Sequence, residues 1–349
     1  MSDPAADPTL NCRSGGGAED LLGLRVASIF IILVGSSSGA LFPVLARRSS
    51  WLHVPKAVFD FAKYFGSGVI IATAFIHLLA PALEALGSPC LSPAWSVYPY
   101  ALALCLLSIF GIFIVELLAF RWGTAKLKKL GLHHDHHGHN LPSHAAHGPE
   151  YNQPATPVEV PKAADEKSEL DSEALQHAHH ANTIADNATA QIIGVAILEF
   201  GVALHSILIG LTLAVDPGFK ILFVVLVFHQ TFEGLGIGSR LAYMRLPHSY
   251  NWVPFAGAVL YGITTPIGIA IGLGARSTYN PGSATASIVS GVLDALSAGI
   301  LMYTGLVELL AHEFLFNKEM MDGSNKQLVY SVGSMLLGCA LMALLGRWA

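Results

Sequence analysis

The sequence predicts an all-α integral membrane protein with eight transmembrane helices. Hydrophobic residues make up 53% of the 349-residue chain and charged residues only 12%, against roughly 25% charged residues in an average soluble domain. The mean hydropathy is correspondingly high, at +0.54. Eight apolar stretches are long enough to cross a bilayer, which takes about 20 residues each.

The first three expected helices follow a polar, glycine-rich tail, residues 1–21. They span Leu22–Ala46, Val58–Leu86 and Pro99–Trp122, so residues 22–122 form one transmembrane unit. The second stretch is long enough to tilt in the bilayer or to continue as a helix beyond it. The tail has no positively charged start leading into a short apolar core, so we expect no cleaved signal peptide.

A long polar segment, Gly123–Thr189, follows the third helix and holds ten of the sixteen histidines. It has too few large apolar residues to bury a core, so we expect it to be disordered. Because dense histidine tracts bind metal ions, we expect regulatory metal ligands at His133, His134, His136, His137, His139, His177, His179 and His180. The alternative is a solvated linker whose histidines bind nothing.

Residues 190–243 contain two apolar helices, Ala190–Val215 and Phe219–Tyr243, joined by a tight turn. His205 lies eleven residues before Asp216 at the start of this turn, and His229 lies eleven residues after Gly218 at its end. At about 1.5 Å of rise per residue, both side chains are about 16 Å from the turn, near the middle of a hydrocarbon layer about 30 Å thick. Ionisable groups at that depth are costly and usually functional.

The last three expected helices, Val253–Ala275, Ala284–Ala311 and Gln327–Gly346, lie within residues 244–349. With eight spans, fourteen Lys and Arg residues fall in one set of alternate loops and tails, and five fall in the other. The positive-inside rule places the side with fourteen in the cytoplasm. Both termini then face outside, and Gly123–Thr189 is cytoplasmic.

An internal repeat relates the second and seventh helices. The segment Gly68–Ala80 matches Gly299–Ala311 at a constant offset of 231, with one Gly, one Thr, two Leu and one Ala identical. The two helices cross the membrane in opposite directions. The pattern therefore predicts an inverted repeat in a 3+2+3 arrangement, which is typical of secondary transporters.

Three side chains in the central helix pair are candidate metal ligands. His229 and Glu233 are four residues apart on one helix face, and His205 is at the same depth on the neighbouring helix. Two imidazoles and one carboxylate suit Zn²⁺ and other borderline divalent ions. We expect accessory roles for Ser206, Gln230 and Glu199. The alternative is that these histidines are hydrogen-bonded packing residues.

His77 and Glu308 are the repeat-related polar pair, and each interrupts an apolar helix. Two roles fit them: they line the ion pathway, or they bond to neighbouring helices and hold the bundle together. Glu116 and Asp294 are further acids within the membrane with the same two alternatives. Cys12 and Cys90 are both expected outside, where they can pair, although the sequence does not show that they do.

The segments His205-Ser-Ile-Leu-Ile-Gly210 and His229-Gln-Thr-Phe-Glu233-Gly234 resemble the fourth- and fifth-helix motifs of the ZIP (Zrt/Irt-like) metal transporters. The fungal and plant branch is the most similar, and the likeness spans Phe59 to Glu313. The resemblance implies import of Zn²⁺ or a related ion by an alternating, elevator-like movement. It also implies ligands at His205, His229 and Glu233, with Ser206 and Gln230 at accessory positions.

One departure from the family pattern concerns the number of ions. Many members carry an acid at the position of Ile209 and another at the position of Gln230, and together these build a site for two metals. Here an aliphatic side chain and an amide replace them, which predicts one tightly held ion. Prolines that bend these helices in other branches are replaced by Leu208 and Phe232.

The sequence therefore predicts a secondary transporter, not an enzyme, that imports Zn²⁺ as its substrate, with Fe²⁺ or Mn²⁺ as alternatives, and that needs no cofactor. An intramembrane zinc hydrolase and a metal-sensing receptor are the competing functions. No P-loop is present, so ATP is not expected to drive transport. We expect a multi-pass protein of the plasma membrane, in contact with lipid and without a nucleic-acid partner. A homodimer is compatible with the sequence.

Overall fold

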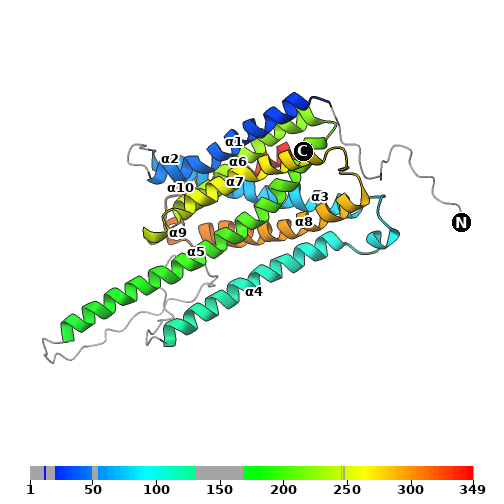
Figure 1. Cartoon of the computed structure of the whole chain (residues 1–349). Coiled ribbons are helices and arrows are strands. Elements are labelled where there is room, and N and C mark those ends of the chain that lie inside the picture. Colours follow the sequence, from blue (N-terminus) through cyan, green and yellow to red (C-terminus); the bar gives the residue numbers. More distant parts are fainter. Residues whose placement is uncertain are drawn as a thin grey trace.

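In the computed structural model, the described part of the chain contains eight helices long and apolar enough to span a membrane (Figure 1). The structure describes Cys12 and residues 20–48, 54–129, 168–244, 246 and 248–348. No strand occurs within these ranges. The predicted all-α architecture with eight spans is therefore confirmed.

Six spans consist of one helix each: α1 (Leu22–Arg48), α4 (Tyr100–Lys129), α5 (Ser168–Val215), α6 (Phe219–Tyr243), α7 (Val253–Ala275) and α10 (Asn325–Leu345). The other two contain π-helical turns: α2 (Lys56–Ala72), η1 (Thr73–Leu79) and α3 (Ala80–Leu86) form one, and α8 (Ala284–Tyr303) and η4 (Thr304–Leu315) form the other. Short helices in the connections are η2 (Pro93–Ser96), η3 (His248–Tyr250) and α9 (Lys318–Met321).

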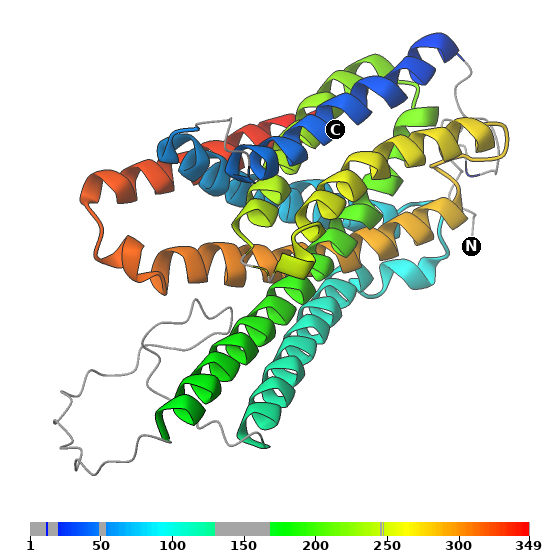
Figure 2. The ribbon, with the colours of Figure 1, turned by 60° about the vertical axis from the view of Figure 1, so that its left-hand side comes forward.

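Two helices extend further than the sequence predicts. The helix α4 continues past Trp122 to Lys129, and α5 begins at Ser168 instead of Ala190. Both extensions project from the same end of the bundle (Figures 1 and 2). A helix already nucleated in a packed span grows by one hydrogen bond per added residue, so these ends of Gly123–Thr189 are helical where we expected disorder.

The spans pack as two groups of helices. In the α1 group, α1 packs on α6 and α7, and α5 packs on α7. In the α2 group, α2 packs on α10, and α3 and α4 pack on α8. Figure 2 shows α1, α6 and α7 lying together along one side of the molecule. The two groups meet where α2 contacts α6 and where α5 contacts α8.

Glycines permit the closest approaches within each group. A Cβ on Gly210 of α5 would lie 2.5 Å from the carbonyl oxygen of Thr265 on α7. A Cβ on Gly68 of α2 would overlap the carbonyl oxygen of Met335 on α10. Small residues that allow backbones to touch are a main source of helix association in membranes, so both groups are held by direct backbone packing.

The buried side chain of Arg25 on α1 holds the end of α5. Its guanidinium donates to the carbonyl oxygens of Leu213, Ala214 and Asp216 at 3.2, 3.0 and 2.9 Å. The last carbonyls of a helix have no N–H partner within that helix, and a cation there also interacts favourably with the helix dipole. The α5–α6 turn is thereby fixed to α1.

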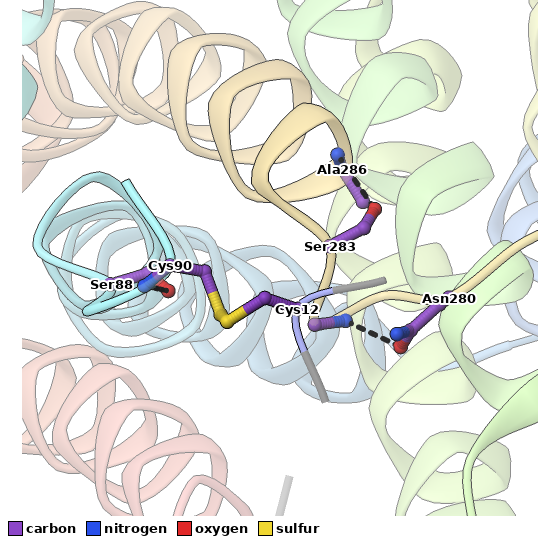
Figure 3. The surroundings of a disulfide bond; sticks show 7 residues. Cys12, Ser88, Cys90, Asn280, Ser283 and Ala286 are labelled. Atoms are coloured by element: carbon purple, nitrogen blue, oxygen red, sulfur yellow. Dashed lines mark hydrogen bonds between the residues drawn. A yellow bond between two sulfur atoms is a disulfide. The ribbon is translucent and has the colours of Figure 1, made fainter. Parts of the chain in front are cut away.

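A disulfide joins Cys12 to Cys90, with Cα atoms 5.4 Å apart (Figure 3). Cys90 lies in the connection after α3, and its N–H donates to Oγ of Ser88 at 3.3 Å. Figure 3 also shows Asn280 and Ser283, from the α7–α8 connection, beside the bond. The disulfide therefore ties the N-terminal tail to the end of the bundle where these two connections meet.

Loss of this disulfide should lower the thermal stability of the protein. The bond joins residues 78 apart in sequence, and removing a disulfide that closes a long segment costs about 2–4 kcal/mol. Cys12→Ser should lower the thermal midpoint in lipid nanodiscs, and adding Cys90→Ser should lower it no further. Cys339→Ser is the matched control. A midpoint for Cys12→Ser equal to that of the control would contradict the prediction.

Candidate metal site

The antiparallel helices α5 and α6 place His205 and His229 side by side. His205 is ten residues before the end of α5, and His229 is ten residues after the start of α6. Their ring centroids are 5.6 Å apart, with an angle of 39° between the planes. Both imidazoles are buried. The two histidines therefore meet at one depth in the bundle.

Glu233 lies one helical turn beyond His229. Its Oε2 is 3.9 Å from Nε2 of His229, and it accepts a hydrogen bond of 3.4 Å from the hydroxyl of Tyr261 on α7. Both Glu233 and His229 are fully buried. The carboxylate and the imidazole thus face the same interior region, with one oxygen held by α7.

The site has an excess of buried atoms without hydrogen-bond partners. Among the residues that the structure describes, both ring nitrogens of His205, both of His229, and Oε1 of Glu233 have none. Leaving such atoms unpaired in an apolar interior costs free energy comparable to that of the lost hydrogen bonds. Side chains that only packed helices together would be expected to pair, so these five atoms favour a bound ligand.

The α2 group places two further side chains next to His205 and His229. His77 lies in η1, with its ring centroid 4.6 Å from that of His229 and its Nε2 donating to the carbonyl oxygen of Met342 at 2.9 Å. Asp294 on α8 places Oδ1 3.6 Å from Nδ1 of His205. The candidate site therefore lies where the two helix groups meet.

The candidate ligands lie near one another but do not surround a single ion position. Among the residues that the structure describes, no three His, Cys, Asp or Glu side chains converge closely enough to hold an ion. Two ligands at about 2.0–2.1 Å from a tetrahedral Zn²⁺ are about 3.3 Å apart. The 3.9 Å between His229 and Glu233 and the 3.6 Å between His205 and Asp294 both exceed this spacing.

Gln230 ties α6 to its neighbours. Its amide donates to Oγ of Ser206 on α5 at 3.5 Å and to the hydroxyl of Thr265 on α7. Its backbone carbonyl accepts a hydrogen bond of 2.7 Å from Tyr261. These bonds hold the face of α6 that carries His229. Ser206 and Gln230 are thus adjacent to the site and engaged with each other.

Two other predicted site residues contact different neighbours. Oε1 of Glu199 lies against α7, 2.7 Å from where a Cβ on Gly257 would be, and has no hydrogen-bond partner. Glu308 in η4 forms an ion pair of 3.1 Å with Arg240 of α6. Of the two alternatives for Glu308, this pair favours a bond between helices.

The predicted loop ligands are largely beyond the described residues. This applies to His133, His134, His136, His137 and His139. The backbone at His177, His179 and His180 belongs to the part of α5 that precedes the apolar span beginning at Ile192.

Sequence reasoning missed the contribution of α7 and left Asp294 undecided. Tyr261 and Thr265 are four residues apart on an apolar helix, so their polar groups share one helix face. This spacing is the feature of the sequence that could have indicated their role. Asp294 is ten residues into α8, the same distance from a helix end as both histidines. In each case the sequence gives the position of the residue along its helix. The side chains that it contacts are on other helices and are known only from the structure.

Comparison with known proteins gives consistent matches. A family model described as ZIP Zinc transporter matches residues 22–346. The chain is 43% identical to Zinc-regulated transporter 1 of Saccharomyces cerevisiae over 340 residues, which cover 94% of this chain and 88% of that protein. It is 39% identical to Zinc-regulated transporter 1 of Schizosaccharomyces pombe, with 99% and 91% covered, and 36% identical to Zinc transporter 9 of Oryza sativa subsp. japonica, with 93% and 89% covered.

Removing the hydroxyl of Tyr261 should weaken metal binding without unfolding the bundle. Tyr261→Phe loses the bonds that orient Gln230 and Glu233, and a buried hydrogen bond contributes about 1 kcal/mol, or about fivefold in affinity. Zn²⁺ affinity of the purified protein measures this. The exposed Tyr250 provides the control, Tyr250→Phe. Equal affinities of the two variants would rule out the orienting role.

Proposed function

The chain belongs to the ZIP zinc transporter family, and we propose that it imports Zn²⁺ into the cytosol by alternating access through His205, His229 and Glu233. The proposal rests chiefly on five buried atoms of these side chains, four imidazole nitrogens and one carboxylate oxygen, that have no hydrogen-bond partner among the described residues. They lie together inside a bundle of membrane-spanning helices. The ion is a substrate and not a cofactor. The matched relatives are named as transporters, so the protein is a transporter and not an enzyme.

The chemistry of the site suits one ion. Two neutral imidazoles and a carboxylate are ligands that Zn²⁺ prefers, and a tetrahedral ion takes one further ligand besides these three. Ile209 packs against an apolar cluster on its side of α5, and the amide of Gln230 is engaged with two hydroxyls. Neither supplies the acids of a second site, which supports transport of one ion at a time.

The inverted repeat gains support from backbone geometry. The π-helical segments η1 and η4 begin at Thr73 and Thr304, which are related by the same offset of 231 as the sequence repeat. Single π-helical turns are rare and often functional. A shared irregularity at matching positions favours two related halves, residues 22–122 and 244–349, around the central pair. Such halves commonly move against each other in transporters.

The pair formed by Arg240 and Glu308 offers a barrier on the cytosolic side. Arg240 is seven residues beyond Glu233 on α6, or about 10 Å further along the helix, and it bonds across to the α2 group at 3.1 Å. A guanidinium in the pathway would repel a dication. We infer that this ion pair separates when the site opens to the cytosol. Glu308 would then control the cytosolic end of the pathway by holding Arg240 in place.

Two independent features support an orientation with both termini outside. The positive-inside rule places in the cytoplasm the side whose loops carry fourteen Lys and Arg residues. Disulfides persist in oxidising compartments and are rare in the cytosol, and the Cys12–Cys90 bond lies at the opposite end. In a plasma membrane, an inside-negative potential would favour entry of a dication by about 4.6 kcal/mol per 100 mV, at 2.3 kcal/mol per charge.

Substitution of each proposed ligand should abolish saturable zinc uptake. His205→Ala, His229→Ala and Glu233→Ala should each lower uptake by more than about tenfold, because losing even an outer partner of a metal ligand costs 10–100-fold in affinity. Uptake of radioactive Zn²⁺ into proteoliposomes with an inside-negative potential measures the effect.

The matched control for that experiment is His248→Ala, since His248 is exposed in η3 and should transport like wild type. If His205→Ala and Glu233→Ala also transport like wild type, the proposed site is wrong.

A further inference from the structure

Asp294 lies at the same depth as the two histidines. It is ten residues after the start of α8, as His229 is ten after the start of α6 and His205 ten before the end of α5. At about 1.5 Å per residue, all three are about 15 Å from these helix ends. Because successive spans alternate in direction, the three ends lie on one side of the bundle.

The carboxylate of Asp294 faces His205 without a hydrogen bond. Its Oδ1 is 3.6 Å from Nδ1 of His205, only 9% of the residue is exposed, and neither atom has a hydrogen-bond partner within the described part of the chain. A carboxylate that joins helices behaves differently in this protein: Glu116 of α4 accepts a hydrogen bond of 2.7 Å from Tyr303 of α8. Asp294 has no such structural bond at Oδ1.

We propose that Asp294 is a fourth ligand of the transported ion, provided by the α2 group to the three ligands of the α1 group. This inference rests on the proposed function and deepens it. The 3.6 Å between Oδ1 and Nδ1 is closer to the spacing of about 3.3 Å between two ligands of a tetrahedral Zn²⁺ than to a hydrogen bond of about 2.9 Å.

Charge balance supports the same assignment. Neutral His205 and His229 with ionised Glu233 would leave a bound dication with a net charge of +1 in a region of low dielectric constant. Uncompensated charge is costly there. The carboxylate of Asp294 makes the ion and its ligands neutral as a set, so it contributes to holding the ion as well as to its geometry.

The position of Asp294 makes this fourth bond depend on conformation. Asp294 is on α8, whereas the other three ligands are on α5 and α6, which belong to the other helix group. A displacement of one group away from the other would separate Asp294 from His205. The ion is then left with three protein ligands and a position open to water, which favours its release after the groups have shifted.

Equilibrium binding of radioactive Zn²⁺ to the full chain in nanodiscs tests the assignment. Asp294→Asn keeps the size and a hydrogen-bond acceptor but removes the charge. His205→Ala removes the membrane site and leaves the histidines of the long loop, so the difference between wild type and His205→Ala isolates the site. Asp294→Asn should weaken that His205-dependent component by at least about tenfold.

The possible outcomes separate the two proposals. Unchanged His205-dependent affinity in Asp294→Asn means that Asp294 only orients His205 or packs beside it, and the inference is overturned while the proposed function stands. If His205→Ala itself leaves zinc binding and uptake unchanged, the proposed site fails, and the assignment of Asp294 fails with it.

A thiol at this position gives a test that does not depend on the stability of Asp294→Asn. Asp294→Cys supplies a softer ligand, so the ratio of Cd²⁺ to Zn²⁺ uptake into proteoliposomes should rise by about tenfold. Ser287→Cys is the control, because Ser287 is buried seven residues earlier on α8. An unchanged ratio in folded Asp294→Cys would show that the side chain does not touch the ion.

Discussion

The centre of this molecule is organised by the cost of keeping ionisable groups in an apolar interior. A charged side chain at the middle of a bilayer costs about 3 kcal/mol even on the most lenient scales, and unpaired polar atoms add to that cost. Arg25 meets this cost with bonds, because its guanidinium donates to three carbonyl oxygens at the end of α5. Around His205, His229 and Glu233, five buried nitrogen and oxygen atoms have no hydrogen-bond partner among the described residues. A bound dication would take one nitrogen of each imidazole and an oxygen of Glu233 as ligands, and this is the simplest physical reason for their presence.

The site depends equally on where it lies between the two helix groups. Gly210 and Gly68 let the helices inside each group touch through their backbones, which makes each group stiff. Between the groups the contacts are of several kinds: Gly66 of α2 approaches Gly236 of α6 backbone to backbone, apolar side chains of α2 and α6 share one cluster, and Arg240 pairs with Glu308. His77 and Asp294 of one group lie beside His229 and His205 of the other. An ion bound at this boundary would therefore contact both groups.

Much of the fold could be predicted from sequence because it follows from apolar length and helical geometry. The eight spans and the common depth of His205 and His229 needed only the rise of a helix and the thickness of a bilayer. The extension of α5 back to Ser168 could not be predicted, since it depends on growth from a packed span. Sequence periodicity also could not assign Asp294 or Tyr261, because their partners are on helices distant in sequence. The pairing of Cys12 with Cys90 was open for the same reason.

Locating the ion directly would test the account most sharply. Crystals of the full-length protein grown with Zn²⁺, with diffraction data recorded on both sides of the zinc absorption edge, would give an anomalous difference peak at each bound ion. We expect a peak between His205 and His229, at about 2.0–2.1 Å from one nitrogen of each ring. Zinc peaks elsewhere in the protein, with none at these two imidazoles in crystals of transport-competent protein, would contradict it.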